Sequence, residues 1–217
     1  GVGYQALAAN TTGQENAAFG TDALLANTTG GKNTALGAYA MNGNTTADNN
    51  TAIGYLALYA NTTADSNTAV GAQTLDANTT GADNTAVGLG ALGANTTATK
   101  NNAFGYGAGA SITTGNYNTA IGDRALFRNT TGTENTALGF LALYNLGLST
   151  SGIDHNTGVG SRALYNCTSG EYNTAIGSYS GHAISTAAQN TTVGYASGDS
   201  LTTGTGNTII GYDADIY

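Results

Sequence analysis

The chain has 217 residues with 33 Gly, one Cys and neither Pro nor Trp, and its five Lys and Arg stand against 13 Asp and Glu, for a net charge of −8. With so few basic residues, the chain lacks the positively charged surface that binding to a nucleic acid or to anionic lipids requires. No apolar run reaches the ~18 residues that a membrane-spanning helix needs, so no membrane insertion is expected in this segment.

A 17-residue repeat organises the whole sequence. One Gly recurs at steps of 17, with a single step of 21 between Gly139 and Gly160. The repeating unit approximates Tyr-x-Ala-Leu-x-Ala-Asn-Thr-Thr-Gly-x-x-Asn-Thr-Ala-Ile-Gly. A unit of this length is too short for a helical-hairpin repeat and fits one coil of a β-solenoid. We therefore predict an all-β parallel β-solenoid of about twelve coils, a single domain over 1–217 with a four-residue loop insertion within 146–151, belonging to a longer chain or filament.

Each unit is expected to hold two short strands. The first is Thr-Ala followed by a large apolar residue, as at 34–36 and 51–53, and the second is Ala-Leu, as at 57–58. Alternate residues of a strand face opposite sides, so Ala should lie on one side and the large residue on the other. We predict that the large residues fill the coil and that the outer alanines are covered by another copy of the chain.

Asn and Gly are expected at the corners, since both tolerate left-handed backbone conformations. Stacked about 4.8 Å apart, Asn and Thr would form amide and hydroxyl ladders. One corner column consists of Asn33, Asn50, Asn67, Asn84, Asn118, Asn135, Asn173 and Asn207.

The segments Asn50–Gly54, Asn118–Gly122 and Asn173–Gly177 resemble the Asn-Ser-Val-Ala-Ile-Gly motif of YadA-type trimeric autotransporter adhesin heads. The full unit is also similar to repeats of bacterial and bacteriophage tail-fibre-like proteins. The resemblance implies a left-handed β-roll, a homotrimer, and binding to matrix or cell surfaces. The adhesin coil is shorter, at about 14 residues, and no stalk, neck or anchor is visible in this sequence.

No catalytic constellation is apparent, and neither a cofactor nor a metal ion is expected. His155, His182 and Cys167 occur at non-recurring positions. Most acidic residues are interpreted as solvated residues at the corners of the coil, although binding of a cation between Asp48 and Asp65 is an alternative. Asp213 and Asp215 are expected to cap the last coil, with ion binding as the alternative.

Two sets of residues are candidates for surface chemistry. The Asn-Thr-Thr tripeptides are formal N-glycosylation sequons, although ladder formation explains the same spacing; they begin at Asn10, Asn27, Asn44, Asn61, Asn78, Asn95 and Asn129. Recurrent aromatics could contact sugars or a partner surface, or could pack along the coil edge. The tyrosines in this set are Tyr4, Tyr55, Tyr59, Tyr106, Tyr144, Tyr165 and Tyr195.

These features favour a non-enzymatic extracellular or cell-surface rod, the head or shaft of a trimeric adhesin or fibre. Its partners would be copies of itself, including end-to-end stacking, and a cell-surface, matrix or glycan ligand. Alternatives are a bacteriophage tail-fibre shaft on a virion, a self-assembling filament subunit, and an ice-binding solenoid in which Thr rows such as Thr12 and Thr29 order water.

Overall fold

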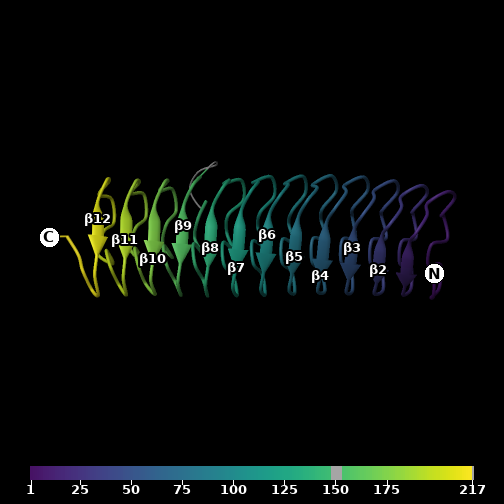
Figure 1. Ribbon diagram of the computed structural model, residues 1–217, viewed down its shortest axis with the longest axis horizontal. Coiled ribbons are helices and arrows are strands. Elements are labelled where there is room, and N and C mark those ends of the chain that lie inside the picture. The colour runs from purple at the N-terminus through teal and green to yellow at the C-terminus, as the bar shows by residue number, and fades with distance from the viewer. Residues whose placement is uncertain (148–152, 217) are drawn as a thin grey trace.

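A computed structural model describes residues 1–147 and 153–216 and shows a parallel β-solenoid (Figure 1). Twelve strands form one sheet in sequence order, and the two termini lie at opposite ends of a straight rod. At about 4.8 Å per strand, the rod is on the order of 55–60 Å long. The strands are β1 Ala17–Phe19, β2 Thr34–Leu36, β3 Thr51–Ile53, β4 Thr68–Val70, β5 Thr85–Val87, β6 Asn102–Phe104, β7 Thr119–Ile121, β8 Thr136–Leu138, β9 Thr157–Val159, β10 Thr174–Ile176, β11 Thr191–Val193 and β12 Thr208–Ile210.

The repeat sets the pairing register. Thr51 pairs with Thr68 and Ile53 with Val70, a step of 17 that recurs along the sheet. Between β8 and β9 the step becomes 21, as Leu138 pairs with Val159. The strands thus stay aligned across the place where four residues were expected to be inserted. The predicted insertion itself falls largely on 148–152, outside the described residues.

Each coil contains one strand rather than the two predicted. The Ala-Leu segment forms a turn, in which Leu24 and Leu58 adopt φ values of 51° and 53°. Such left-handed residues cannot continue a strand, and each costs roughly 1–2 kcal/mol. Both side chains of the segment point inward, with Ala57 and Leu58 fully buried. Burial of a leucine, worth roughly 1.5–3 kcal/mol, offsets its strained backbone.

The prediction that the strand alanines face outward is wrong. Ala35, Ala52 and Ala69 are fully buried inside the coil, and the large residue that follows each one points outward. The interior is narrow because it must also hold the leucine of the opposite turn and two columns of asparagine. A methyl group therefore suits the inward position of most strands, and the larger Thr192 and Ile209 take it only in β11 and β12.

The predicted amide ladders are confirmed, and they lie inside the rod. In the longer column, each Asn Oδ1 accepts the backbone N–H of the Asn one coil further on, as from Asn33 to Asn50 and from Asn50 to Asn67 at 2.9 and 2.8 Å. The side-chain amide of Asn50 donates to the carbonyl of Ala64 at 2.9 Å. These fully buried amides therefore satisfy the polar groups of the corner instead of water.

The second asparagine column covers only part of the rod. Nδ2 donates to Oδ1 of the preceding coil from Asn27 to Asn95, at 2.6–3.1 Å. At the next coil Ile112 takes this place, and Asn95 Oδ1 is one of two buried side-chain polar atoms without a partner among the described residues. Threonine adds a hydroxyl ladder beside it, as Thr28 Oγ1 donates to the Thr45 carbonyl at 3.0 Å.

Candidate binding surfaces

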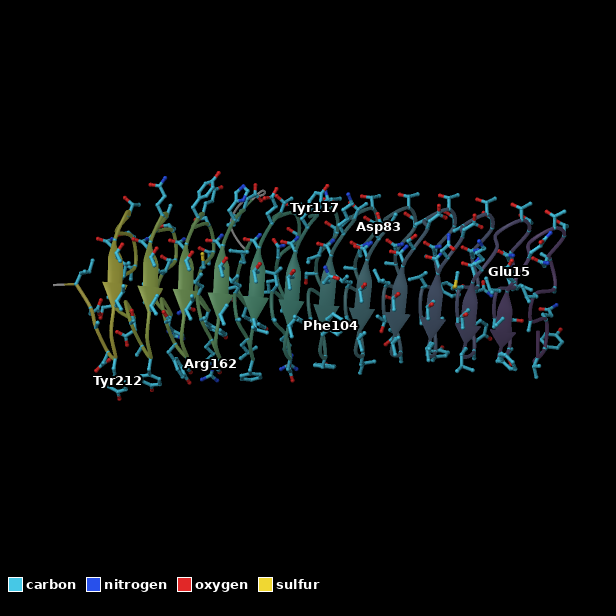
Figure 2. All side chains as sticks on the ribbon, viewed as in Figure 1. Glu15, Asp83, Phe104, Tyr117, Arg162 and Tyr212 are labelled. Carbon is cyan, nitrogen blue, oxygen red and sulfur yellow. The ribbon has the colours of Figure 1, made fainter. Side chains whose placement is uncertain are left out.

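Exposed side chains gather in rows that run along the rod, because each coil repeats the position of the one before. Figure 2 shows Arg162 and Tyr212 on one long edge, Glu15, Asp83 and Tyr117 on the other, and Phe104 over the strands between them. Three of these rows differ in chemistry.

The first is the apolar row, formed by the last residue of every strand together with Val2, which bridges to Phe19. Exposed fractions are 48% for Leu36 and 41% for Phe104 and rise to 69% for Ile210, whereas the valines that end strands are half-buried. A threonine two residues earlier in most strands flanks the row on the same face. The row comprises Val2, Phe19, Leu36, Ile53, Val70, Val87, Phe104, Ile121, Leu138, Val159, Ile176, Val193 and Ile210.

The second is the aromatic–arginine row on the edge that follows the strands. The Arg124 guanidinium lies 5.1 Å from the ring centre of Tyr106, and the Arg162 guanidinium lies 5.9 Å from Phe140 and 5.5 Å from Tyr179. Rings continue the row toward the C-terminal end, with Tyr195 stacked on Tyr212 at 5.3 Å. Aromatic side chains thus alternate with cations over the C-terminal half of the rod.

The third is a ring stack of four side chains that occupy one coil position in successive coils. Phe127, Tyr144, Tyr165 and His182 stack with centroids 5.4–5.5 Å apart and planes within 7°. All four are half-buried. Because each ring covers the face of its neighbour, the stack ties coils together and presents ring edges to solvent.

The predicted surface tyrosines divide between these rows. Tyr4, Tyr55, Tyr59, Tyr106 and Tyr195 are exposed, with Tyr106 and Tyr195 in the aromatic–arginine row. In contrast, Tyr144 and Tyr165 belong to the ring stack. Coil-edge packing, the alternative to surface contact, accounts for these two.

The structure opposes glycosylation at the Asn-Thr-Thr sites of the folded rod. Asn27, Asn44, Asn61, Asn78, Asn95 and Asn129 have no exposed surface, and Asn10 is half-buried. The amide nitrogen that would carry a sugar donates hydrogen bonds inside the ladder, for instance from Asn61 to the Ala64 carbonyl at 3.0 Å. A glycan at such a site would have to displace the neighbouring coil.

Acidic side chains accept hydrogen bonds from the backbone at the corners of the coil. Asp48 accepts the backbone N–H of Gly31 at 2.6 Å, and Asp65 accepts that of Asp48 at 2.7 Å. Among residues 1–147 and 153–216, no group of three or more His, Cys, Asp or Glu is placed to hold a metal ion. The carboxylates predicted as a cation alternative thus bind backbone amides. A shallow hollow beside Asp48 is lined by residues that include Thr12, Glu15 and Lys32.

The predicted cap of the last coil is present at Asp215. Its carboxylate accepts backbone N–H groups from Ser200 at 3.0 Å and from Ile216 at 2.9 Å. Burial raises the pKa of Asp215, but the hydrogen bonds from Ser200 and Ile216 outweigh it and leave this pKa below its usual value. Asp213 lies nearby and its backbone N–H donates to the Tyr195 carbonyl.

Cys167 and the two histidines occupy three different positions of the coil. The thiol takes the place of a ladder asparagine inside the core, His182 ends the ring stack, and His155 lies on the opposite edge, 3.2 Å from Glu134. Nothing in this placement assembles a nucleophile with a base.

Burial raises the pKa of Cys167 to about 12, although a hydrogen bond to the Gly170 carbonyl opposes the shift. Because only the thiolate is an effective nucleophile, we expect no measurable alkylation of the folded protein by iodoacetamide at pH 8. Complete labelling should follow in guanidinium chloride, as monitored by intact mass. Rapid labelling of the folded rod would contradict the buried placement.

Two residues central to the aromatic–arginine row were not singled out from the sequence: Arg162 and Tyr179. His182 was noted from the sequence only as a histidine at a non-recurring position. The ring stack leaves a signal, because aligned repeats place an aromatic or His at one position in four successive coils. The aromatic–arginine row leaves a weaker signal, since its members alternate between two neighbouring coil positions and no single column of the repeat contains them.

No family model, curated protein or solved structure matches this chain. In the described residues, no helix is long and apolar enough to cross a membrane. The function is therefore inferred from the surfaces of the rod.

Proposed function

We propose that the protein is a non-enzymatic extracellular rod, the head or shaft of an adhesin or fibre, in which three copies associate through the apolar row. The observation that carries the proposal is the continuity of this row along the sheet from Val2 to Ile210. The adhesin and bacteriophage-fibre versions share this architecture, and both place it outside a cell, on a cell surface or on a virion.

The size of the apolar row supports an interface. Thirteen side chains, each exposing roughly 60–80 Å², would give about 800–1,000 Å² per chain, as in a standard stable interface. Monomers rarely leave apolar patches beyond about 300–600 Å² uncovered. A partner that buries a side chain on every coil must also share the coil repeat. Another copy of the chain meets this condition through its own sequence.

Introduction of positive charge into the apolar row tests the proposal. Leu36 and Leu138 point outward from strands and are 48% and 42% exposed, so lysine at both should leave the coil intact while placing like charges at the interface. We expect the wild-type protein to scatter light as three times the chain mass of 21.5 kDa and the double variant to be monomeric.

The matched control is Tyr55→Lys with Leu89→Lys, because these residues are 52% and 47% exposed but lie on the edge after the strand. This variant should stay trimeric, and circular dichroism should show that both variants fold. A monomeric wild-type protein at micromolar concentration would contradict the proposal. It would favour the ice-binding alternative, since the threonine and apolar rows of the sheet would then face water, and thermal hysteresis would measure that activity. The Thr12 and Thr29 row named from the sequence lies in bends, not on a strand face.

A further inference from the structure

The strongest unassigned feature of the surface is the environment of Arg162. Its guanidinium lies between the rings of Phe140 and Tyr179, at 5.9 and 5.5 Å, and donates a hydrogen bond to the Tyr179 hydroxyl. The ion pairs found among the described residues are Arg124–Asp123 and His155–Glu134, so Arg162 has no carboxylate partner there.

A histidine adjoins this arginine. The ring of His182 lies 5.5 Å from that of Tyr179 and 5.5 Å from that of Tyr165. Burial and the nearby charge of Arg162 lower the pKa of His182, against an opposing effect of Asp199. Tyr179 contacts both Arg162 and His182, so the two groups lie on the same edge, where a bound anion would raise the pKa of His182.

We propose that this edge, formed by Phe140, Arg162, Tyr179, His182 and Tyr195, binds an oligosaccharide that carries a carboxylate. A guanidinium held between ring faces keeps its N–H edge available for a bidentate bond to a planar carboxylate. Tyrosine rings and hydroxyls beside it offer the mixed apolar and hydrogen-bonding surface that suits sugar rings.

The extent of the surface favours an extended ligand over a small anion. Tyr179 contacts Tyr195 at 6.1 Å, and Tyr195 stacks on Tyr212 at 5.3 Å, so aromatic groups continue for two coils beyond Tyr179. Tyr195 and Tyr212 are 48% and 79% exposed. A chain of sugar rings lying along the rod would contact several of these groups at once, with its carboxylate at Arg162. Sugar binding at this edge and trimer formation through the apolar row use different residues. Loss of one would therefore not imply loss of the other.

The test titrates the wild-type protein with 3′-sialyllactose and with a hyaluronan tetrasaccharide, following the His182 ring signals by NMR. His155, which lies on the other edge beside Glu134 and Tyr172, is the internal reference. Saturable binding of at least one acidic sugar should raise the pKa of His182 and leave the His155 signals unchanged. Lactose should bind at least tenfold more weakly than sialyllactose.

Arg162→Gln should weaken acidic-sugar binding at least tenfold, in keeping with the strength of a charged hydrogen-bonded pair. Lys100→Gln is the matched control, since it also removes one positive charge that lies over a tyrosine ring, 5.3 Å from the centre of Tyr117, but on the opposite edge of the rod. Light scattering should show the same oligomer for both variants. Failure of both acidic sugars to bind, equal losses in both variants, or equal binding of acetate would each overturn the proposal.

Discussion

Replacement of Gly105, one of the glycines that stack at the end of each strand, by alanine is expected to destabilise the rod strongly. Gly105 follows β6 with φ +136°, and a Cβ there would lie 2.5 Å from the carbonyl oxygen and 2.6 Å from the carbonyl carbon of Gly122. Neither atom can move without separating two coils. Backbone strain of about 1–3 kcal/mol and overpacking of a similar size add up to about 2–6 kcal/mol.

Gly90→Ala provides the control for this prediction. Gly90 also has a positive φ, +66°, but nothing lies within 4 Å of the Cβ it would acquire. Its expected cost is therefore the left-handed backbone alone, about 1–2 kcal/mol. Denaturant unfolding followed by circular dichroism would compare the two variants. Equal shifts in the unfolding midpoint would show that contact between stacked glycines does not limit coil spacing.

The sequence was sufficient to predict the coil, because the 17-residue step is itself the strand register. Thr85 pairs with Asn102, and Val87 with Phe104, as equal spacing requires. It was not sufficient to assign inside and outside. A three-residue strand with a threonine and a large apolar residue on one side and an alanine on the other has no clearly polar face to orient it. The choice between inside and outside depends on the width of the finished coil.

Buried asparagine was the second difficulty, since a polar residue ordinarily indicates solvent. The column at Asn27 and Asn44 is buried because each amide satisfies its neighbours, which only the stacked coils make possible. The repeats nevertheless contain a signal of this burial. Where the turn leucine becomes Gly109 or Gly181, the ladder position three residues later becomes Ile112 or Ile184.

This exchange conserves core volume. The Cβ that Gly109 lacks would lie 3.0 Å from Ile112 Cδ1, and that of Gly181 would lie 3.1 Å from Ile184 Cδ1. The isoleucine therefore fills the space that a leucine occupies in other coils. Compensating changes within one chain thus place the ladder position in the core. The aromatic–arginine row has no such signal, because its contacts join different coil positions.

The exchange at Ile112 also makes Asn101 a sensitive rung of the longer ladder. The Oδ1 atom of Asn101 accepts the N–H of Asn118 at 2.8 Å, and its amide donates to the Gly115 carbonyl at 2.9 Å. In coils that keep the second asparagine, the corresponding carbonyl also receives a bond from it, as Ala98 does from both Asn84 and Asn95. Ile112 cannot supply that bond.

Asn101→Ala should therefore leave two buried groups unpaired, the Asn118 N–H and the Gly115 carbonyl. At about 1–3 kcal/mol for each, the free energy of unfolding should fall by about 2–6 kcal/mol. Asn84→Ala removes the same side chain and orphans the Asn101 N–H, but Asn95 still serves the Ala98 carbonyl, so the loss should be smaller by about 1–3 kcal/mol. Thermal and denaturant unfolding of the two variants would measure the difference. Equal destabilisation of the two variants would contradict this account. It would mean that the Gly115 carbonyl does not depend on Asn101, and that a second asparagine does not compensate when the first donor to a corner carbonyl is lost.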